Sequence, residues 1–244
     1  MSGQLFRRLA VVAVAAGVGL SAAAQSPGDP YIPVPPVSLA LDRDGVWTMN
    51  FAYLPPRIVS VDTPDRGKQT VWYMVYQVWN TSDTPQTFIP TFELVTRDGP
   101  QMTFLDSPEP AIADKIRAIE DPTGSLDLKT SISISKQKIP VTRALSLPRK
   151  VHGVAVWPTV SEKAGSVNRF SVFVTGLSNG LAVSQRDDGS EEVRLKTLQL
   201  DFIRPTDNAR PMLGDIRPND NGGLGAEKWV YRVAPVAKKA EPKK

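Results

Sequence analysis

Apolar and polar residues alternate with a period of two in many short segments between residues 37 and 233. Successive side chains of a β-strand point to opposite faces, so this period predicts strands. Turn residues and prolines separate the segments. The strands expected in this way are 37–41, 46–53, 69–79, 87–96, 102–105, 131–135, 151–157, 170–174, 181–184, 193–203 and 229–233.

Two of these segments depart from simple alternation. Segment 69–79 is apolar on both faces, which is typical of a central strand that is covered on both sides. Trp72, Met74, Tyr76 and Val78 share one face, and Val71, Tyr73, Val75 and Trp79 share the other. In segment 193–203 the apolar residues change face near Thr197, which predicts a β-bulge at that point.

One helix is expected after Ser107-Pro108-Glu109, a suitable N-terminal cap. Ile112, Ile116 and Ile119 then form a narrow apolar stripe, and Asp121-Pro122 ends the helix. The sequence therefore predicts an all-β fold, a two-sheet sandwich over 37–235 with one short peripheral helix. The alternatives are an open barrel, or two small sandwiches divided near Pro122, although neither half alone has enough strands for its own core.

The N-terminal residues 1–24 have the pattern of a cleavable signal peptide. Arg7 and Arg8 precede an apolar stretch of twelve residues, 9–20, and Ala22-Ala23-Ala24 offers a cleavage site before Gln25. At a rise of about 1.5 Å per residue the stretch spans about 18 Å, short of a bilayer core of about 30 Å. An uncleaved anchor is the alternative. We expect a periplasmic or secreted protein with no membrane span after cleavage.

The segments that flank the predicted domain differ from it in composition. Residues 25–36 are rich in proline, which opposes ladder pairing and predicts an extended linker. Residues 236–244 form a basic tail that we expect to be disordered. Arg7 and Arg8 leave with the leader, and the tail holds four lysines and one glutamate. Of the formal charge of +4, residues 25–237 therefore keep −1, and a nucleic-acid partner is not expected.

Candidate chemistry is sparse, since the chain has no cysteine and a single histidine. Thiolate catalysis, cysteine zinc sites and iron–sulfur clusters are thereby excluded. Segment 176–180 matches the G-x-S-x-G motif around Ser178, but no helix is predicted after it and His152 precedes the serine, contrary to the order in that class of hydrolase. We interpret the segment as a turn and His152 as a structural residue, and we expect no enzyme activity and no cofactor.

Two acidic turns resemble parts of a calcium-binding loop. They are Asp42-Arg43-Asp44-Gly45 and Asn219-Asp220-Asn221-Gly222. In an EF-hand alignment on the glycine, the first and last ligand positions would hold Ala40 and Phe51, or Arg217 and Lys228, none of which is a carboxylate. Both stretches are interpreted as turns, and no metal is expected.

Aromatic residues in the strands provide the remaining candidate site. Exposed rings on a sheet face can stack on sugars or on an apolar partner, whereas buried rings are part of the core. Core positions are favoured for most of them. Tyr73 and Trp79 are the two that we expect to face outward and to bind a ligand.

Between Val71 and Gly99, an aromatic strand ends in Trp79-Asn80-Thr81, and a second strand, from Phe88-Ile89-Pro90 to Leu94, precedes Asp98-Gly99. Segments 148–157 and 170–177 form a further expected strand pair. This order resembles the immunoglobulin-like sandwich of exported bacterial proteins of unknown function, over about half of the mature chain. The resemblance implies a fold and a compartment, with no catalytic residues to transfer.

The function expected from the sequence is a non-catalytic extracytoplasmic interaction or structural module of the bacterial envelope, with a protein or an envelope polymer as its partner. The alternative is a carbohydrate-binding module that uses the strand aromatics. A third hypothesis, a hydrolase around Ser178, depends on a catalytic set that the sequence does not supply.

Overall fold

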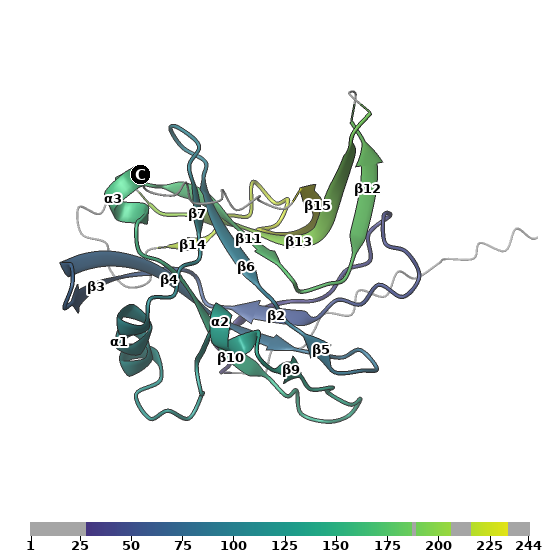
Figure 1. Cartoon of the computed structure of the whole chain (residues 1–244), viewed down its shortest axis with the longest axis horizontal. Helices are drawn as coiled ribbons and strands as arrows, with labels where there is room; N and C mark the ends of the chain where they lie inside the picture. Colours follow the sequence, from purple (N-terminus) through teal and green to yellow (C-terminus); the bar gives the residue numbers. More distant parts are fainter. Residues whose placement is uncertain (1–27, 187–188, 206–215, 234–244) are drawn as a thin grey trace, which may run out of the picture.

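The computed structural model describes residues 28–186, 189–205 and 216–233 (Figure 1). The predicted signal peptide, residues 1–24, and the predicted basic tail, residues 236–244, lie outside the described residues. The described chain is mostly β-structure, which confirms the all-β class. It forms two large sheets and a small ladder of β5 (Gln86–Thr87) with β9 (Lys138–Ile139).

The first sheet has six strands in the order β1-β2-β4-β10-β8, and β3 pairs with β4 beside β2. Its strands are β1 (Ile32–Val34), β2 (Asn50–Tyr53), β3 (Arg57–Thr63), β4 (Gly67–Trp79), β8 (Lys129–Thr130) and β10 (Val151–Trp157). All neighbours are antiparallel except β8 and β10.

The second sheet has seven strands, all antiparallel to their neighbours. They are β6 (Thr91–Thr96), β7 (Thr103–Leu105), β11 (Arg169–Thr175), β12 (Leu181–Gln185), β13 (Glu191–Ile203), β14 (Arg217–Pro218) and β15 (Glu227–Val233). Strand β13 pairs with four strands. Strands β12 and β11 lie along one of its edges, and β15 and β14 lie along the other.

The inner faces of the two sheets share one apolar core. Trp72 of β4 meets Phe170 of β11 edge to face, with 5.3 Å between the ring centroids. The ring centroids of Tyr76 and of Phe92 on β6 are 4.7 Å apart. Each sheet contains strands from both halves of the chain, so the alternative of two sandwiches divided near Pro122 is wrong. Strand β4 is buried on both faces as predicted, because its second face lies under a helix.

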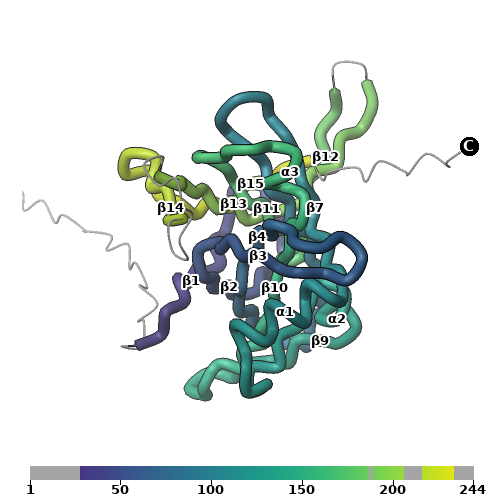
Figure 2. Tube along the Cα trace, turned by 90° about the vertical axis from the view of Figure 1, so that its left-hand side faces the viewer, coloured from purple at the N-terminus to yellow at the C-terminus, as the bar shows by residue number. Residues whose placement is uncertain are grey.

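That helix is α1 (Pro110–Glu120), which covers the outer face of the first sheet (Figures 1 and 2). Ile112 and Ile116 are buried, while Ile119 is 48% exposed, so the predicted stripe is correct for two of its three positions. The expectation of a single helix is wrong, because the described residues also form α2 (Ser131–Ile134) and α3 (Val160–Ala164).

Helix α2 replaces the strand predicted over 131–135. Ser133 donates its backbone N–H to Thr130 Oγ1, and the Ser133 hydroxyl accepts the N–H of Thr130. This reciprocal capping box stabilises a helical turn. The alternating serines suggested the solvent-facing side of a strand, but Ser133 and Ser135 instead form hydrogen bonds with the backbone of this turn.

Three further expectations need correction. Segment 37–41 forms no strand, whereas Ile32–Val34 of the predicted linker pairs with β2; Pro33 is tolerated there because β1 is an edge strand. Strand β13 keeps an unbroken register with β15, so there is no bulge at Thr197. Its apolar residues change face because its first part lies in a projecting hairpin and its second part lines the core. Finally, β10 and β11 lie in different sheets and do not pair.

Candidate functional site

The hydroxyl of Ser178 serves to fasten a loop. It donates to the carbonyl of Trp47 at 2.6 Å and accepts from Thr48 Oγ1 and from the N–H of Gly180, both at 3.1 Å. Gly176 has a φ of 85°, and a Cβ there would lie 2.2 Å from the carbonyl oxygen of Ile89. The motif is therefore a turn whose glycine is required by its backbone conformation and by close packing.

His152 lies on β10, on the outer face of the first sheet. Its Nε2 is 3.0 Å from Nε2 of Gln77, and the ring of Tyr31 meets it edge to face at 6.1 Å. Burial, aided by the charge of Lys150, lowers the pKa of His152 below 6.5. Ser178 follows β11 of the second sheet and shares no hydrogen-bond partner with His152. The structure thus does not bring the two residues into a catalytic pair.

The two acidic turns have structural roles. The carboxylate of Asp42 accepts hydrogen bonds from the N–H of Leu39, from Lys196 Nζ and from the hydroxyl of Tyr231. Asn221 donates to Asp201. Within residues 28–186, 189–205 and 216–233, no three His, Asp or Glu side chains gather as metal ligands would.

Of the two aromatic residues predicted to bind a ligand, only one reaches the surface. Tyr73 is 0% exposed beneath α1, and its hydroxyl donates to Glu120 Oε1 at 2.6 Å, so the expectation that it faces outward is wrong. Trp79 is partly exposed at the end of β4. Lys150 Nζ lies 5.5 Å from the centre of its ring and also forms an ion pair with Asp29 at 2.7 Å.

No described helix packs against the outer face of the second sheet, although the side chains at its centre are themselves buried: Glu93, Ser171 and Thr197 are each 3% exposed or less. Helices α1 and α2 pack against strands of the first sheet, and α3 packs against β4, so no described helix covers this face. Pairing places four strands side by side in the order β6, β11, β13, β15. The outward side chains, which alternate with the core residues, are polar or charged at most positions. They include Glu93, Arg97, Ser171, Phe173, Thr197, Gln199, Asp201, Lys228 and Arg232.

Two guanidinium groups shield the aromatic ring at the centre of this face. The guanidinium carbon of Arg232 lies 4.0 Å from the centroid of Phe173, and that of Arg97 lies 5.5 Å from it. Cation–π contact and burial of the ring both favour this arrangement. Arg232 also forms a bidentate pair with Glu93 of β6. Phe173 is consequently only 4% exposed.

A polar groove of about 380 Å³ lies beside this ring, over β11 and β13. Asp201 forms its floor and accepts hydrogen bonds from Ser171 Oγ at 2.6 Å, Gln199 Nε2 at 2.8 Å and Asn221 Nδ2 at 2.9 Å. Burial alone would raise the pKa of Asp201, but these donors lower it below 3.8, so the carboxylate stays ionised at neutral pH.

The rim of the groove carries two arginines without a carboxylate partner. Arg97 Nε donates to Ser171 Oγ at 2.9 Å, and the exposed Arg169 makes no side-chain hydrogen bond or ion pair with any described residue. Their remaining N–H groups face solvent. A guanidinium presents a planar fork of donors that fits carboxylates and phosphates, so this rim is suited to hold an anionic ligand.

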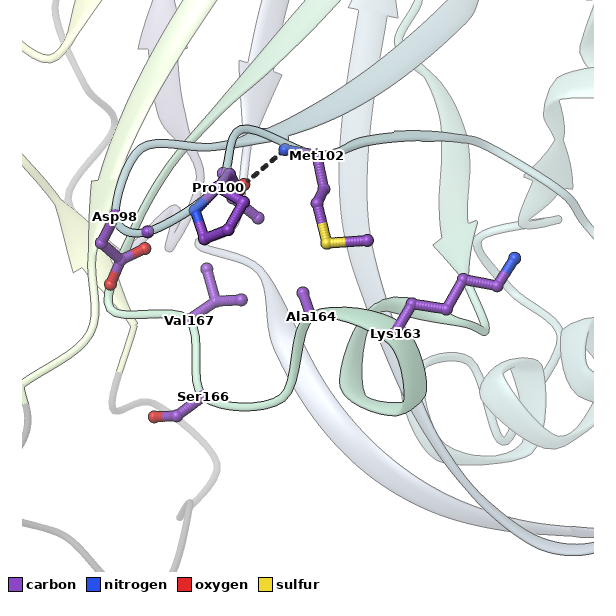
Figure 3. Close-up of a pocket in the computed structure, with 9 residues that line it drawn as sticks. Asp98, Pro100, Met102, Lys163, Ala164, Ser166 and Val167 are labelled. Atoms are coloured by element: carbon purple, nitrogen blue, oxygen red, sulfur yellow. Dashed lines mark hydrogen bonds between the residues drawn. The ribbon is translucent and has the colours of Figure 1, made fainter.

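A smaller hollow of about 280 Å³ lies between the β6–β7 turn and the segment that joins α3 to β11 (Figure 3). Pro100, Met102, Ala164 and Val167 line its middle, and Asp98 and Lys163 lie at opposite ends. Asp98 Oδ2 accepts the N–H of Asn168. The hollow is smaller than most small-molecule sites, which occupy about 300–1,000 Å³.

Comparison of the chain with protein-family models, with curated proteins and with solved structures finds no match. In the part of the chain that the structure describes, no helix combines the length and the apolar character that crossing a bilayer requires.

Proposed function

We propose that this protein is a non-catalytic interaction or structural module of the bacterial envelope, periplasmic or secreted, with an immunoglobulin-like sandwich fold. Its partner binds the outer face of the second sheet. The observation that carries the proposal is the groove beside Phe173, whose rim holds Arg97 and Arg169 without carboxylate partners. The leader-like residues 1–24 support the compartment.

The chemistry of the groove favours a partner that carries carboxylates, such as an acidic envelope polymer or an acidic protein segment. The carboxylate of Asp201 already accepts bonds from three side chains, and Lys228 Nζ lies 3.5 Å away, so its charge is compensated inside the groove. The two arginines at the rim therefore supply the uncompensated charge. Each carboxylate that binds a guanidinium through two parallel hydrogen bonds gains a charge-assisted contact.

Binding to poly-L-glutamate and to polygalacturonate, measured by isothermal titration calorimetry, tests this proposal. Replacing both residues, Arg97→Gln and Arg169→Gln, should weaken binding at least about tenfold, because a hydrogen bond to a charged group contributes about 1.5–3 kcal/mol. Arg143→Gln is the matched control, an exposed arginine in the loop between β9 and β10. No binding of either polymer, or equal binding by the double variant, would count against the proposal.

The second candidate is a carbohydrate-binding module centred on Trp79. In its favour, this ring is partly exposed at the end of β4, and an exposed aromatic face can stack on a sugar. Saturable binding to neutral glycans on an array, abolished by Trp79→Ala and kept by the arginine double variant, would favour this function over the first.

A further inference from the structure

Strand β12 has one edge that no described strand pairs with. It forms a hairpin with β13 that projects from the body in two views (Figures 1 and 2). Gly180 accepts the N–H of Lys196, and Arg186 donates its N–H to Ser190, so residues 180 and 186 face β13 with their backbone groups. Because these groups alternate along an antiparallel strand, those of Leu181, Val183 and Gln185 point away from β13.

The side chains on one face of this hairpin are apolar and exposed. Leu181 is 43% exposed, Val183 is 44% exposed, and Val193, which lies opposite Val183 on β13, is 45% exposed. Together they make a small apolar strip beside unpaired backbone donors and acceptors. An edge of this kind is a template for pairing with another strand.

The other edge strands of the described sheets carry the features by which proteins block such pairing. Proline occurs in β1 and β14, charged residues occur in β3 and β15, β7 is only three residues long, and β5, β8 and β9 have two residues each. Strand β12 is five residues long, Leu-Ala-Val-Ser-Gln, with no charge and no proline. It is thus the edge that lacks protection.

We propose that β12 pairs with β12 of a second copy of this chain, antiparallel and with a twofold axis at Val183. In that register Val183 lies opposite Val183 of the second copy, and Leu181 lies opposite Gln185. The three outward N–H groups of each copy then meet outward carbonyls of the other. No charged residue lies opposite another within the paired segment, and the two apolar strips join on one face.

The contact is small, below the 1,200 Å² or so of a stable interface, so we expect a reversible dimer with a dissociation constant of roughly 10–100 µM. This inference is independent of the proposed function, since the arginine rim lies over another part of the sheet. Binding of acidic polymers should be unchanged in variants of β12.

Sedimentation equilibrium of the chain as purified from an expressing host, between about 5 and about 500 µM, measures the dimer. Hydrogen exchange followed by NMR locates it. The amides of Leu181, Val183 and Gln185 should become protected as concentration rises, whereas those of Ala182 and Ser184 should be protected at all concentrations by β13. Fast exchange of the first three amides at the highest concentration would overturn the proposal.

A pair of matched variants separates edge pairing from contact through the apolar face. Val183→Lys brings two like charges together at the twofold axis and should abolish the dimer. Val193→Lys places the same charge on the same face at nearly equal exposure, but one strand away from the axis, and should weaken the dimer by no more than a few-fold. A dimer that survives Val183→Lys, or one that both variants abolish equally, would refute pairing through β12.

Discussion

A variant that breaks the buried ion pair between Lys196 and Asp42 tests how much this pair contributes to the stability of the fold. Lys196 points to the inner side of β13 with its side chain 2% exposed, and its Nζ lies 2.6 Å from Asp42 Oδ2. Asp42 belongs to the loop before β2, so this contact fastens a long loop to the second sheet. Tyr231 of β15 donates to the same carboxylate at 2.8 Å. Asp42→Asn removes the charge and leaves the ammonium of Lys196 buried without a counterion.

Breaking a buried pair by removing one partner costs about 3–5 kcal/mol, since the remaining charge stays desolvated. We expect Asp42→Asn to lower the free energy of unfolding by that amount at pH 7. Adding Lys196→Met should recover part of the loss, because the uncompensated charge is then gone. Asp44→Asn, an exposed carboxylate in the same turn, should change the stability by less than about 0.5 kcal/mol.

The pH dependence of the Asp42→Asn effect follows from the pKa of the Asp42 carboxyl. Burial alone would raise this pKa, but the bonds from Lys196, the Leu39 N–H and Tyr231 lower it below 3.8. A carboxyl with a depressed pKa in the folded state stabilises the fold above its unfolded value and loses this contribution as pH falls. The difference between wild type and Asp42→Asn should therefore shrink below about pH 4.

Urea denaturation followed by tryptophan fluorescence measures these free energies. A loss under about 1 kcal/mol for Asp42→Asn at pH 7, or no recovery with Lys196→Met, would refute the assignment of a buried, mutually dependent pair.

Two further stability predictions follow from groups near β10. Burial raises the pKa of Asp106 to about 6, although its hydrogen bonds from Ser131 and from the N–H of Val156 act in the opposite direction. The stability of the wild type should thus fall as pH rises from about 4 to about 6, and Asp106→Asn should gain up to about 3 kcal/mol over the wild type at pH 7; equal pH profiles would contradict this. In Gly153→Ala, the new Cβ would lie 2.2 Å from Cζ of the fully buried Tyr76, so a loss of at least about 2 kcal/mol is expected in thermal or urea denaturation. Adding Tyr76→Leu should relieve part of that loss, and an unchanged Gly153→Ala variant would show that the ring has room to move.

Strands could be predicted from the sequence where the faces that are buried are the faces that carry the apolar residues. Strand β4 has large apolar side chains on both faces, and only a strand covered on both sides can bury them, so its central position followed from the residues. The strand predicted over 131–135 was wrong, because polar side chains there form hydrogen bonds with the backbone of a helical turn. Ser133 closes a capping box, and the alternation around it resembled a half-buried strand.

The candidate groove was beyond sequence reasoning. The groove and the cluster around Phe173 combine residues of β6, β11, β13 and the Asn221 loop with Arg232 of β15, segments far apart in the chain. The sequence indicated that alternate residues of these strands face away from the core. It did not indicate which strands are neighbours, and so it could not show that Arg97, Ser171 and Asp201 meet.

Sequence alone determined the class of fold, the central strand, the existence of the helix that carries Ile112 and Ile116, and the lack of cysteine chemistry, because each depends on local composition or on a short period. Only the tertiary structure decided the pairing of strands, the burial of Tyr73, the separation of Ser178 from His152 and the open edge of β12. These depend on contacts between residues distant in the chain, and the period of a strand records which face is apolar but not what covers it.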